Sequence, residues 1–418
     1  MPKINKIYAH EILDSRANPT VEAVVILEGG AYGVSSVPSG SSTGSYEAVE
    51  LRDNDLNRYL GHGVTKAVGN INHDISQALV GSDINSVSDL DSKLIALDGT
   101  PNKSKLGANA ILGVSMAMTK ALATHEHLPL YRYIAKIAGN NEKLIIPIPV
   151  FNMINGGRHG AGNLDFQEFH VIPSRITTFA AMLETGSEIY QTIKKLLARR
   201  GAIHSVGDEG GFAPNLFTNL DALEILNESI LEVHHKPGVD VELGLDVASN
   251  SFWKDGKFTI KDRSSAMDTG EFIEYLRDLN SQYHLRLLED PLNEDDWHGW
   301  SALTQELGQF TTIVGDDLLV TNKERVKKAI EEKACTAALI KPNQIGTVSE
   351  TIEVVKLARS ANWKINVSHR SGETTDTFIA DFAVGVGSDY AKFGAPARGE
   401  RVCKYNRFLS IETELAQL

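Results

Sequence analysis

Charged side chains stand at the ends of successive short apolar runs in the second half of the chain. They are Asp246, Glu289, Asp316, Lys341, His369 with Arg370, and Lys392. Each interval between neighbours is long enough for a helix that returns the chain to the same side. In a (β/α)8 barrel the carboxyl ends of all parallel strands open onto one face, where catalytic residues sit. The pattern therefore predicts one pocket lined by three acids, two lysines, an arginine and a histidine.

The three acids Asp246, Glu289 and Asp316 offer hard oxygen ligands, and no cysteine or paired histidine lies near them in the sequence. Such a set favours magnesium over zinc. Any one of these acids is explained as readily by a helix N-cap, a frequent role for aspartate. That explanation is hard to sustain for three consecutive strand–helix units followed by units that end in lysine and in His-Arg. We therefore expect a magnesium site.

Two further acidic segments could join this pocket. Glu209 lies in the glycine-flanked loop at residues 206–211, and Glu168 follows Gln167 in a run just after His159. Taken alone, a Gly-Asp-Glu-Gly segment is more often a plain turn. A glutamate that faces other acids can, however, be held protonated and serve as a general acid.

Short apolar runs alternate with amphipathic segments from Leu144 onward, which predicts parallel strands with crossover helices. The candidate strands are residues 145–151, 166–172, 203–207, 241–246, 285–289, 311–316, 337–341, 365–369 and 389–393. The candidate helices are residues 179–199, 222–234, 271–279, 323–333 and 348–359. Nine strands are one too many for an eight-stranded barrel, and residues 203–207 are the weakest.

The N-terminal part follows a different pattern. Residues 21–37 read as two strands around a Glu28-Gly29-Gly30 turn, followed by a small, polar loop at residues 38–44. Residues 107–123 form an Ala-, Leu- and Met-rich helical stripe that belongs in a core. We predict a smaller α+β domain at residues 1–135 and an α/β barrel at residues 136–418.

Composition limits the classes of partner and compartment. The net charge is −13, so a nucleic-acid surface is not expected. The two cysteines exclude a disulfide scaffold and suit a reducing compartment. No signal-peptide core or membrane-spanning run is recognisable, so we expect a soluble, cytoplasmic protein without a membrane partner.

The chain resembles the enolases over nearly its whole length. The motifs that carry the resemblance are Asp14-Ser15-Arg16, Ser39-Gly40-Ser41-Ser42-Thr43-Gly44, Asn155-Gly156-Gly157, Gly207-Asp208-Glu209-Gly210-Gly211, Leu288-Glu289-Asp290-Pro291, Gly315-Asp316-Asp317, residues 341–346 and residues 368–374. The resemblance implies a barrel of ββαα(βα)6 order, in which residues 203–207 are not a strand. It also implies magnesium-dependent interconversion of 2-phosphoglycerate and phosphoenolpyruvate in glycolysis and gluconeogenesis, by a homo-oligomer that is at least a dimer.

The resemblance also implies a role for each matching position. Asp246, Glu289 and Asp316 would hold the first magnesium, and Ser39, in a mobile loop, would join a second magnesium once substrate is bound. Lys341 would be the base at C2 and Glu209 the acid for the leaving hydroxyl, with Glu168 beside it. His159, Gln167, His369, Arg370, Ser371 and Lys392 would contact substrate, with Arg370 and Ser371 on its phosphate.

This inventory fits the chemistry of the implied reaction. Removing the C2 proton next to a carboxylate builds a doubly negative group, which two divalent cations stabilise. A lysine must be neutral to act as the base, and nearby metal charge lowers its pKa. Hydroxide leaves poorly and needs a proton from an acid.

The chain departs from the family pattern at a few positions. Ala17 stands where enolases usually have glycine, which would strain the turn if its φ is positive. Further departures are Ser41, Tyr46, Gly160-Ala161, Ser251 and Thr375. They put loop dynamics and rate in doubt rather than the reaction.

Two other functions stay open. One is an acid-sugar dehydratase or racemase of the wider superfamily, which shares the three carboxylates but lacks an Arg370-Ser371 phosphate anchor and a Glu209-type loop. The other is a non-catalytic surface-binding protein on the same fold, since enolases are also found at cell surfaces. A binding role alone would not need every acid, base and ligand. The chain also ends in Leu418, without the terminal lysine that lysine-binding partners capture.

Overall fold

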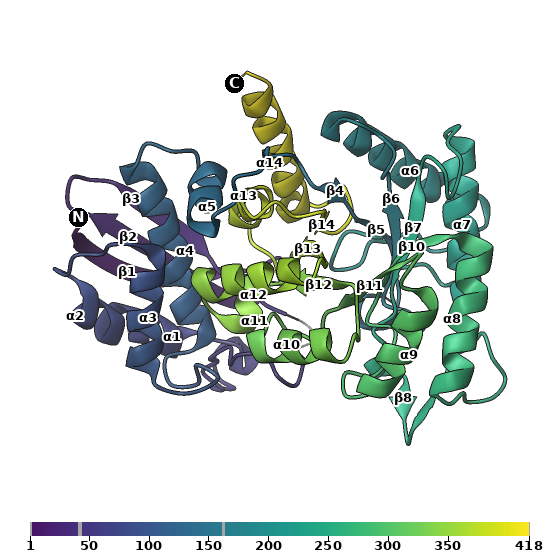
Figure 1. The fold of residues 1–418 in the computed structure, drawn as a ribbon, viewed down its shortest axis with the longest axis horizontal. Coiled ribbons are helices and arrows are strands. Elements are labelled where there is room, and N and C mark those ends of the chain that lie inside the picture. Colours follow the sequence, from purple (N-terminus) through teal and green to yellow (C-terminus); the bar gives the residue numbers. More distant parts are fainter. Residues whose placement is uncertain (1, 41–43, 161–163, 418) are drawn as a thin grey trace.

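The N-terminal part is a three-stranded antiparallel sheet with helices packed against it (Figure 1). The computed structural model describes residues 2–40, 44–160 and 164–417. The strands are β1 (Ile4–Leu13), β2 (Pro19–Leu27) and β3 (Tyr32–Ser36), with Gly29 and Gly30 at positive φ in the predicted turn. β1 was not predicted, because its lysine, histidine and glutamate disguise an alternation in which Ile4, Ile7 and Ala9 face the core.

Helices complete this first unit. They are α1 (Thr65–Asn70) and α2 (Ser76–Leu79), joined by a π-helical turn at Ile71–Ile75, then α3 (Val87–Asp98), α4 (Ala108–His125) and α5 (Leu130–Ala138). The predicted stripe is α4, which is buried along most of its length and packs on β2 and β3. Gly113 allows the close approach, since a Cβ there would lie 3.2 Å from the Cβ of Ala23. The boundary at residue 135 stays a prediction and falls inside α5.

The second part is a barrel whose sheet closes on itself. Its strands are β4 (Ile148–Pro149), β5 (Phe151–Asn155), β6 (Glu168–Ile172), β7 (Glu242–Asp246), β10 (Leu285–Glu289), β11 (Thr312–Gly315), β12 (Ala337–Ile340), β13 (Lys364–Ser368) and β14 (Tyr390–Lys392). They pair in the order β4-β14-β13-β12-β11-β10-β7-β6-β5. Only Val150 separates β4 from β5, so these two strands are one staggered barrel strand that joins both ends of the sheet.

One strand does not run in the direction expected from an alternation of strands and helices, which predicts parallel strands throughout. β6 runs antiparallel to both β5 and β7, whereas the remaining pairs are parallel. Two strands, two helices and then six strand–helix units follow one another, which confirms the ββαα(βα)6 order. Residues 203–207 are not a strand, since Val206 makes only an isolated bridge to Phe212.

The helices of the barrel surround its strands (Figure 1). They are α6 (Phe179–Arg199), α7 (Asn219–Glu232), α8 (Thr269–Tyr283), α9 (Trp297–Leu307), α10 (Lys323–Glu331), α11 (Pro342–Ile345), α12 (Val348–Ser360), α13 (Phe378–Gly385) and α14 (Gly399–Ala416). The five predicted barrel helices all form, α6 with the predicted bounds. Capping boxes at Thr218/Asp221 and Asp268/Glu271 fix where α7 and α8 begin. A small β8–β9 hairpin (Trp253–Lys254, Lys257–Phe258) and 3-10 turns at Tyr59–Gly61, Gly157–His159 and Ser249–Ser251 complete the elements.

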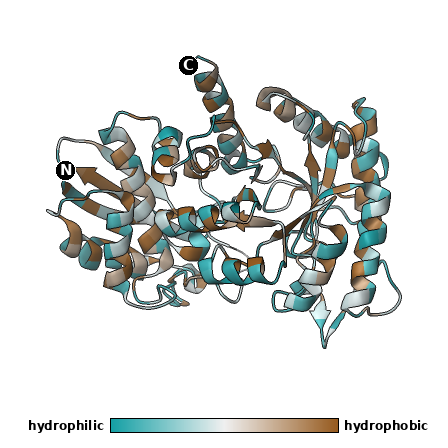
Figure 2. Cartoon of the chain, viewed as in Figure 1, coloured by the Kyte–Doolittle hydropathy of each residue, from teal (hydrophilic) through white to brown (hydrophobic). Residues whose placement is uncertain are grey.

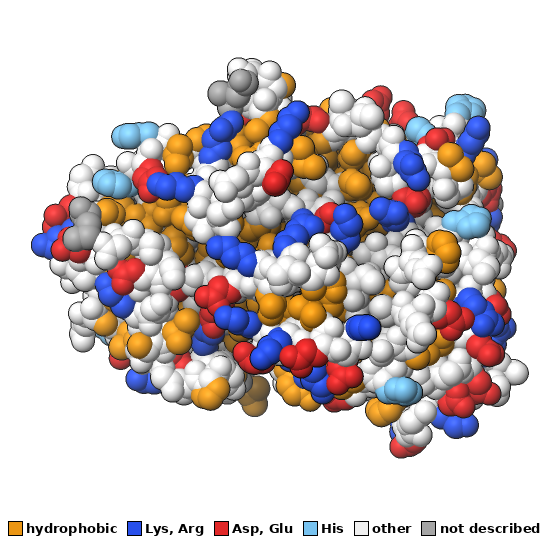
Figure 3. Space-filling view, in the orientation of Figure 1, with side chains coloured by type: hydrophobic (Ala, Val, Ile, Leu, Met, Phe, Trp, Pro, Cys, Tyr) orange, Lys and Arg blue, Asp and Glu red, His pale blue; other side chains and the backbone are white. Residues whose placement is uncertain are grey.

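Apolar residues concentrate on the strands and on the inner faces of the helices, while polar residues predominate on the outer faces (Figure 2). A small apolar layer inside the barrel includes Ile172, Leu287, Val314 and Leu339. This layer fills the interior of the barrel, and the polar groups lie beyond it, at the carboxyl ends of the parallel strands. Lysines, arginines and acids are interspersed over the face in Figure 3. No helix within the described residues has the length and apolar character to span a membrane.

Candidate active site

The predicted charged residues meet at one end of the barrel. Asp246, Glu289 and Lys392 are the last residues of their strands, and Asp316 and Lys341 directly follow theirs. Glu168 opens β6, and because β6 is antiparallel its first residue lies at the same end. A cavity of about 20 Å³ is lined by His159, Gln167, Glu168, Glu209, Asp246, Asp316, Lys341, Ser368, His369, Arg370, Ser371 and Lys392. Most of the predicted set therefore shares one small, polar cavity.

Lys392 is the centre of the carboxylate group. Its Nζ lies 2.9 Å from Glu289 Oε1, 3.2 Å from Asp246 Oδ2 and 3.1 Å from Glu168 Oε2. Burial raises the pKa of Glu289 well above its usual range, and the charge of Asp246 adds to this despite Lys392. Burial also raises the pKa of Asp246. One lysine thus leaves a surplus of buried negative charge.

Lys341 is paired with Asp316. Its Nζ lies 2.5 Å from Asp316 Oδ2, and although burial opposes it, the carboxylate charge raises the pKa of Lys341. Gln344 donates to the other oxygen of Asp316 at 2.9 Å, and Thr321 donates to Gln344 at 2.8 Å and accepts from the amide of Lys341 at 2.9 Å. The lysine is therefore held, as an ammonium, in a fixed position.

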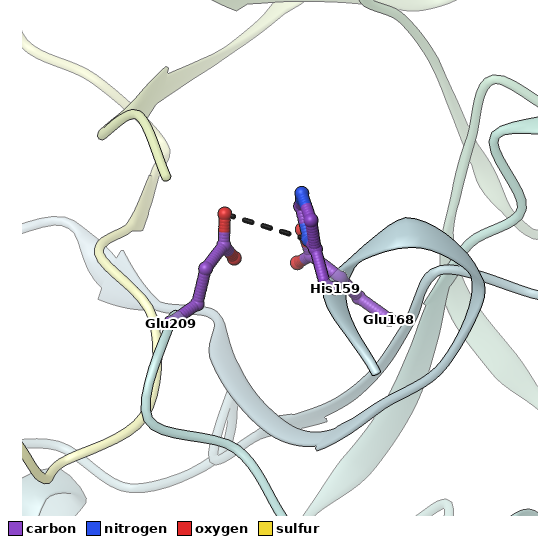
Figure 4. Close-up of side chains that lie close together, drawn as sticks. All are labelled: His159, Glu168 and Glu209. Carbon is purple, nitrogen blue, oxygen red and sulfur yellow. Dashed lines mark ion pairs between the residues drawn. The ribbon is translucent and has the colours of Figure 1, made fainter. Parts of the chain in front are cut away.

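Glu209, in the loop at residues 206–211, lies beside a histidine as well as another acid. His159 Nδ1 lies 3.3 Å from Glu168 Oε1 and 3.5 Å from Glu209 Oε1 (Figure 4). Burial and Glu168 would raise the pKa of Glu209, but His159 and His369 outweigh them and lower it to about 2. The expectation that neighbouring acids hold Glu209 protonated is therefore wrong for this arrangement. The pKa of His159 is raised, because Glu209 and Glu168 together outweigh its burial.

Partners that the sequence did not reveal surround this loop. Asn152 donates to Glu209 Oε2 at 3.0 Å, and His170 Nε2 lies 2.9 Å from Glu168 Oε2. Gly211 has no room for a side chain, because a Cβ there would lie 2.3 Å from Asn155 Oδ1. Gly211 is thus required by close packing on β5, whereas Gly210 has φ 87° and a Cβ there would lie 2.9 Å from Ala397 O. Asn155-Gly156-Gly157 was recognised as a motif, but Asn152 and His170 carried no usable signal.

Arg370 is held by a glutamate. Its NH1 and NH2 donate to the two oxygens of Glu47 at 3.0 and 3.1 Å, and NH1 also donates to Asn343 at 2.9 Å. Glu47 was missed because it lies in the N-terminal part, 323 residues away in sequence. Ser371 is buried at the cavity wall, and its carbonyl accepts from Ser15 at 3.2 Å. A planar guanidinium of this kind suits a phosphate or carboxylate group.

Ser39 is fixed beside the segment that carries Ser371. Its amide and carbonyl are hydrogen-bonded to Gly372 at 2.7 and 2.8 Å. Its hydroxyl donates to Asp14 at 2.8 Å and accepts from Arg16 at 3.1 Å. Binding a cation through this hydroxyl would therefore require the bond to Asp14 to break. The tip of the same loop, residues 41–43, lies outside the described residues.

The residue after Arg16 bears out the predicted strain. Ala17 has φ 61°, in the left-handed region that favours glycine. Asp14 organises this turn, since Oδ1 accepts from the amides of Arg16 and Asn18 at 2.8 and 2.9 Å. The strained turn thus belongs to the support of Ser39.

Other departures from the family pattern lie around the site. Ser251 lines a larger cavity of about 190 Å³ that shares Gln167, Asp246 and Asp316 with the small one. Tyr46 donates to Asp295 at 3.0 Å and stacks on Arg325, and Thr375 is exposed. Gly160 is required, because a Cβ would lie 2.5 Å from Asn155 O. Ser41 and Ala161 lie outside the described residues.

Two acidic groups could hold a metal by distance alone. Among the described residues, ligand atoms within 4.8 Å of one another occur in His159/Glu168/Glu209 and in Asp290/Asp316/Asp317. Asp290 already accepts the amides of Asp316 and Asp317, both at 2.8 Å, so it positions the turn after β11. The expected set of Asp246, Glu289 and Asp316 does not converge as tightly, and its oxygens lie on Lys392 and Lys341.

The expected set nevertheless fits a hard divalent cation. All its donors are carboxylate oxygens at the ends of adjacent strands, and the three residues are at most 8% exposed. The raised pKa values of Glu289 and Asp246 mark buried negative charge that a cation would relieve. Oxygen-only donors suit Mg²⁺.

Family models match both parts of this chain. The model described as "Enolase, N-terminal domain" matches residues 4–134, and the model described as "Enolase, C-terminal TIM barrel domain" matches residues 143–418. These matches agree with the ββαα(βα)6 barrel and with the acids and lysines around its open end. With both domains matched over nearly its whole length, the chain belongs to the enolase family.

Proposed function

We propose that this protein is an enolase that catalyses the reversible, Mg²⁺-dependent dehydration of 2-phospho-D-glycerate to phosphoenolpyruvate. The observation that carries the proposal is the shared lining of the small cavity. A candidate base (Lys341), a candidate acid group around Glu209 and a candidate phosphate anchor (Arg370) all border it. This combination suits removal of a proton and a hydroxide from neighbouring carbons of a phosphorylated acid.

Lys341 is the proposed base at C2. In the structure its ammonium lies on Asp316, and it must become neutral before it can accept a proton. Mg²⁺, when bound, would supply positive charge that stabilises the doubly negative group at the substrate carboxylate and lowers the pKa of Lys341. Gln344 holds the carboxylate of Asp316 and Thr321 holds the backbone of Lys341, so the lysine keeps its position while it loses its proton.

Glu209, with His159 and Glu168, is the proposed source of the proton for the leaving hydroxyl. Glu209 is ionised in the structure, whereas the pKa of His159 is raised by both carboxylates. The proton therefore resides on His159, 3.5 Å from Glu209 Oε1, and Glu209 passes it to the hydroxyl. The acid is thus a group of three residues rather than one glutamate.

Substrate binding is assigned to the remaining polar groups. Arg370 and Ser371 bind the phosphate, while Lys392, Gln167 and His369 contact the rest of the molecule. Asp246, Glu289 and Asp316 would hold one Mg²⁺, and Ser39 would join a second Mg²⁺ when substrate is present. The buried guanidinium of Arg370 favours a phosphorylated substrate over the sugar acids of related dehydratases and racemases.

The proposed setting follows from the same reaction. We assign the protein to glycolysis and gluconeogenesis in the cytoplasm, as a homo-oligomer that is at least a dimer. A secondary surface-binding role is compatible with this assignment, but it would not account for the buried acids and lysines. Neither nucleic acid nor membrane is a proposed partner.

The test is a spectroscopic assay. Adding 2-phosphoglycerate with Mg²⁺ should raise the ultraviolet absorbance as the conjugated enol phosphate forms, and a chelator should abolish the rise. Asp316→Ala should lose the high-affinity Mg²⁺ in a direct binding titration. No turnover of 2-phosphoglycerate, together with activity on an unphosphorylated sugar acid, would assign the chain to the dehydratases or racemases. No turnover of either substrate would favour the binding protein.

A further inference from the structure

Arg401 is a buried cation to which the mechanism assigns no role. It lies in the first turn of α14 and is 0% exposed. The rest of α14 packs on the outside of the barrel, but this guanidinium reaches the loop that carries Glu209 and the segment that carries His369. Its Nε lies 3.5 Å from Glu400 Oε1 without a hydrogen bond, so the partners of its two terminal nitrogens define its role.

The four terminal N–H groups of Arg401 have four acceptors. NH1 lies 2.5 Å from Arg370 O and 2.7 Å from His369 Nδ1. NH2 lies 2.6 Å from Ser371 O and 3.0 Å from Asp208 O. Three acceptors are backbone carbonyls, which are ordinary structural partners. The fourth is a ring nitrogen of a residue that borders the active cavity.

The contact with His369 determines where the histidine carries its proton. A guanidinium is always a donor and has no lone pair to offer. Nδ1 of His369 must therefore be the acceptor and cannot carry a hydrogen. The neutral ring then carries its proton on Nε2, which lies 3.3 Å from Glu209 Oε2. The same contact disfavours the doubly protonated ring, which would direct an N–H at a cation.

The surrounding charges agree with this assignment. The charged groups that act on His369 are Arg401 on α14, Glu209 in its loop and Glu168 on β6. Burial and Arg401 lower the pKa of His369 to about 4, against the opposing effect of the two glutamates. His159, on the other side of Glu209, has a raised pKa because the charges of Glu209 and Glu168 outweigh its burial. The two imidazoles beside Glu209 thus differ in protonation.

We propose that Arg401 is a positioning residue that fixes His369 as the neutral Nε2–H tautomer. His369 then directs an N–H toward Glu209, whose Oε2 lies 3.3 Å from Nε2, and is excluded as a store of the transferred proton. This inference rests on the proposed function for its catalytic meaning, since it leaves the His159 side of Glu209 as the route of proton transfer. The tautomer itself does not depend on which substrate the protein uses.

The first test uses the unmodified protein without substrate. Histidine labelled with ¹⁵N reports the protonation of each ring nitrogen, and a His369→Gln variant assigns the signal of His369. We expect an unprotonated Nδ1 and a protonated Nε2 from pH 8 down to about pH 5. An Nδ1–H tautomer, or an imidazolium at pH 7, would overturn the proposal. Either result stands whether or not the protein turns over 2-phosphoglycerate.

The second test changes the arginine. In Arg401→Gln the ring loses its adjacent cation, so the pKa of His369 should rise by at least about one unit. The acid limb of the pH profile of kcat should shift in the same direction. Arg401→Lys keeps a charge and a donor and should restore much of the wild-type pKa. A purely structural role for Arg401 predicts lower stability with an unshifted His369 signal in both variants.

Lys404 supplies a matched control one turn further along α14. It is also 0% exposed and donates to Thr374 O and Glu400 O at 3.0 and 2.9 Å, but it does not contact His369. Lys404→Gln should therefore lower stability without moving the pKa of His369. An equal shift in both glutamine variants would refute a specific role for Arg401. If Arg401→Gln does not fold, the tautomer in the unmodified protein decides the question.

Discussion

Asp91 offers a quantitative test of how the two parts of the chain are joined. It lies on α3 of the N-terminal part, is 0% exposed, and its Oδ2 accepts the amide of Ser349 at 2.9 Å. Ser115 on α4 accepts the neighbouring amide of Val348 at 3.0 Å. These are the first amides of α12 in the barrel, which have no partners within their own helix. Asp91 thus caps a helix of the other part of the chain.

The contribution of Asp91 to the free energy of unfolding follows from the pKa of its carboxyl group. Burial raises the pKa of Asp91 from 3.8 to about 6, although Ser115 and Ser349 oppose the shift. Because the folded-state pKa is raised, its contribution to stability is complete below about pH 4 and is lost as the pH rises through about 6. A shift of this size corresponds to about 3 kcal/mol at pH 8. An asparagine can still accept the amide but never ionises.

We therefore expect Asp91→Asn to be more stable than the wild type at pH 8, by about 1–3 kcal/mol, and no more stable at pH 4. For a chain of this size that is a rise in Tm of about 1–3 °C. Thermal unfolding followed by circular dichroism at several pH values would measure it. A variant that is equally destabilised at pH 8 and pH 4 would refute the reasoning.

Asp98 on the same helix is the control. Its carboxylate accepts the amides of Leu106 and Thr100 at 2.7 and 2.9 Å, which outweigh burial and lower its pKa. Its contribution is therefore present above the unfolded pKa and is lost as the pH falls. Asp98→Asn should destabilise the protein at pH 8 and have a smaller effect at pH 4, opposite in sign to Asp91→Asn.

Three further predictions concern the site and its support. Ala17→Gly should stabilise the protein by about 0.5–1 kcal/mol in urea unfolding, because relief of the positive φ exceeds the entropy that glycine adds to the unfolded chain; unchanged or lower stability would contradict this. Arg370→Lys keeps the charge but loses the fork, so it should weaken 2-phosphoglycerate binding about 10- to 100-fold, and an unchanged KM would assign the phosphate to other residues. Glu209→Gln should lower phosphoenolpyruvate formation about 10²- to 10⁴-fold while C2 of 2-phosphoglycerate still exchanges with deuterated water. Lys341→Ala should abolish both, and the reverse pattern would exchange the two roles.

The sequence indicates the barrel well because its last six strands each lead into a charged residue and most of the crossovers between them are amphipathic. It does not reveal strand direction, since an apolar run such as β6 has the same pattern whether parallel or antiparallel. The prediction also omitted α13, whose residues Phe378–Gly385 are almost all buried and therefore show no helical period. The β1 strand was missed for another reason, because polar side chains such as Asn5, Lys6 and His10 on its exposed face obscure the apolar alternation.

The candidate site was predicted by position but not by protonation. A sequence places Glu209 near other acids, but the pKa depends on which groups the fold brings within a few ångströms. His369 and Asn152 come from distant strands and stabilise the ionised form. Glu47 and Arg401 were likewise invisible, because a charged residue in a helix or loop reads as solvent-exposed until its burial is known.

The active groups share one further property, which bears on how ligands bind. Arg370 is paired with Glu47, Lys341 with Asp316, and the Ser39 hydroxyl with Asp14. A buried charge that loses its partner is destabilised by about 3–5 kcal/mol, so no one of these pairs opens readily by itself. A cation on Asp316 would replace the ammonium of Lys341, and a phosphate on Arg370 would replace the carboxylate of Glu47, so each ligand has the same charge sign as the side chain that it displaces. The cation leaves the charge of Lys341 unpaired, the phosphate leaves the charge of Glu47 unpaired, and these two released charges are opposite in sign. Binding of Mg²⁺ and of the phosphorylated acid should therefore be mutually dependent.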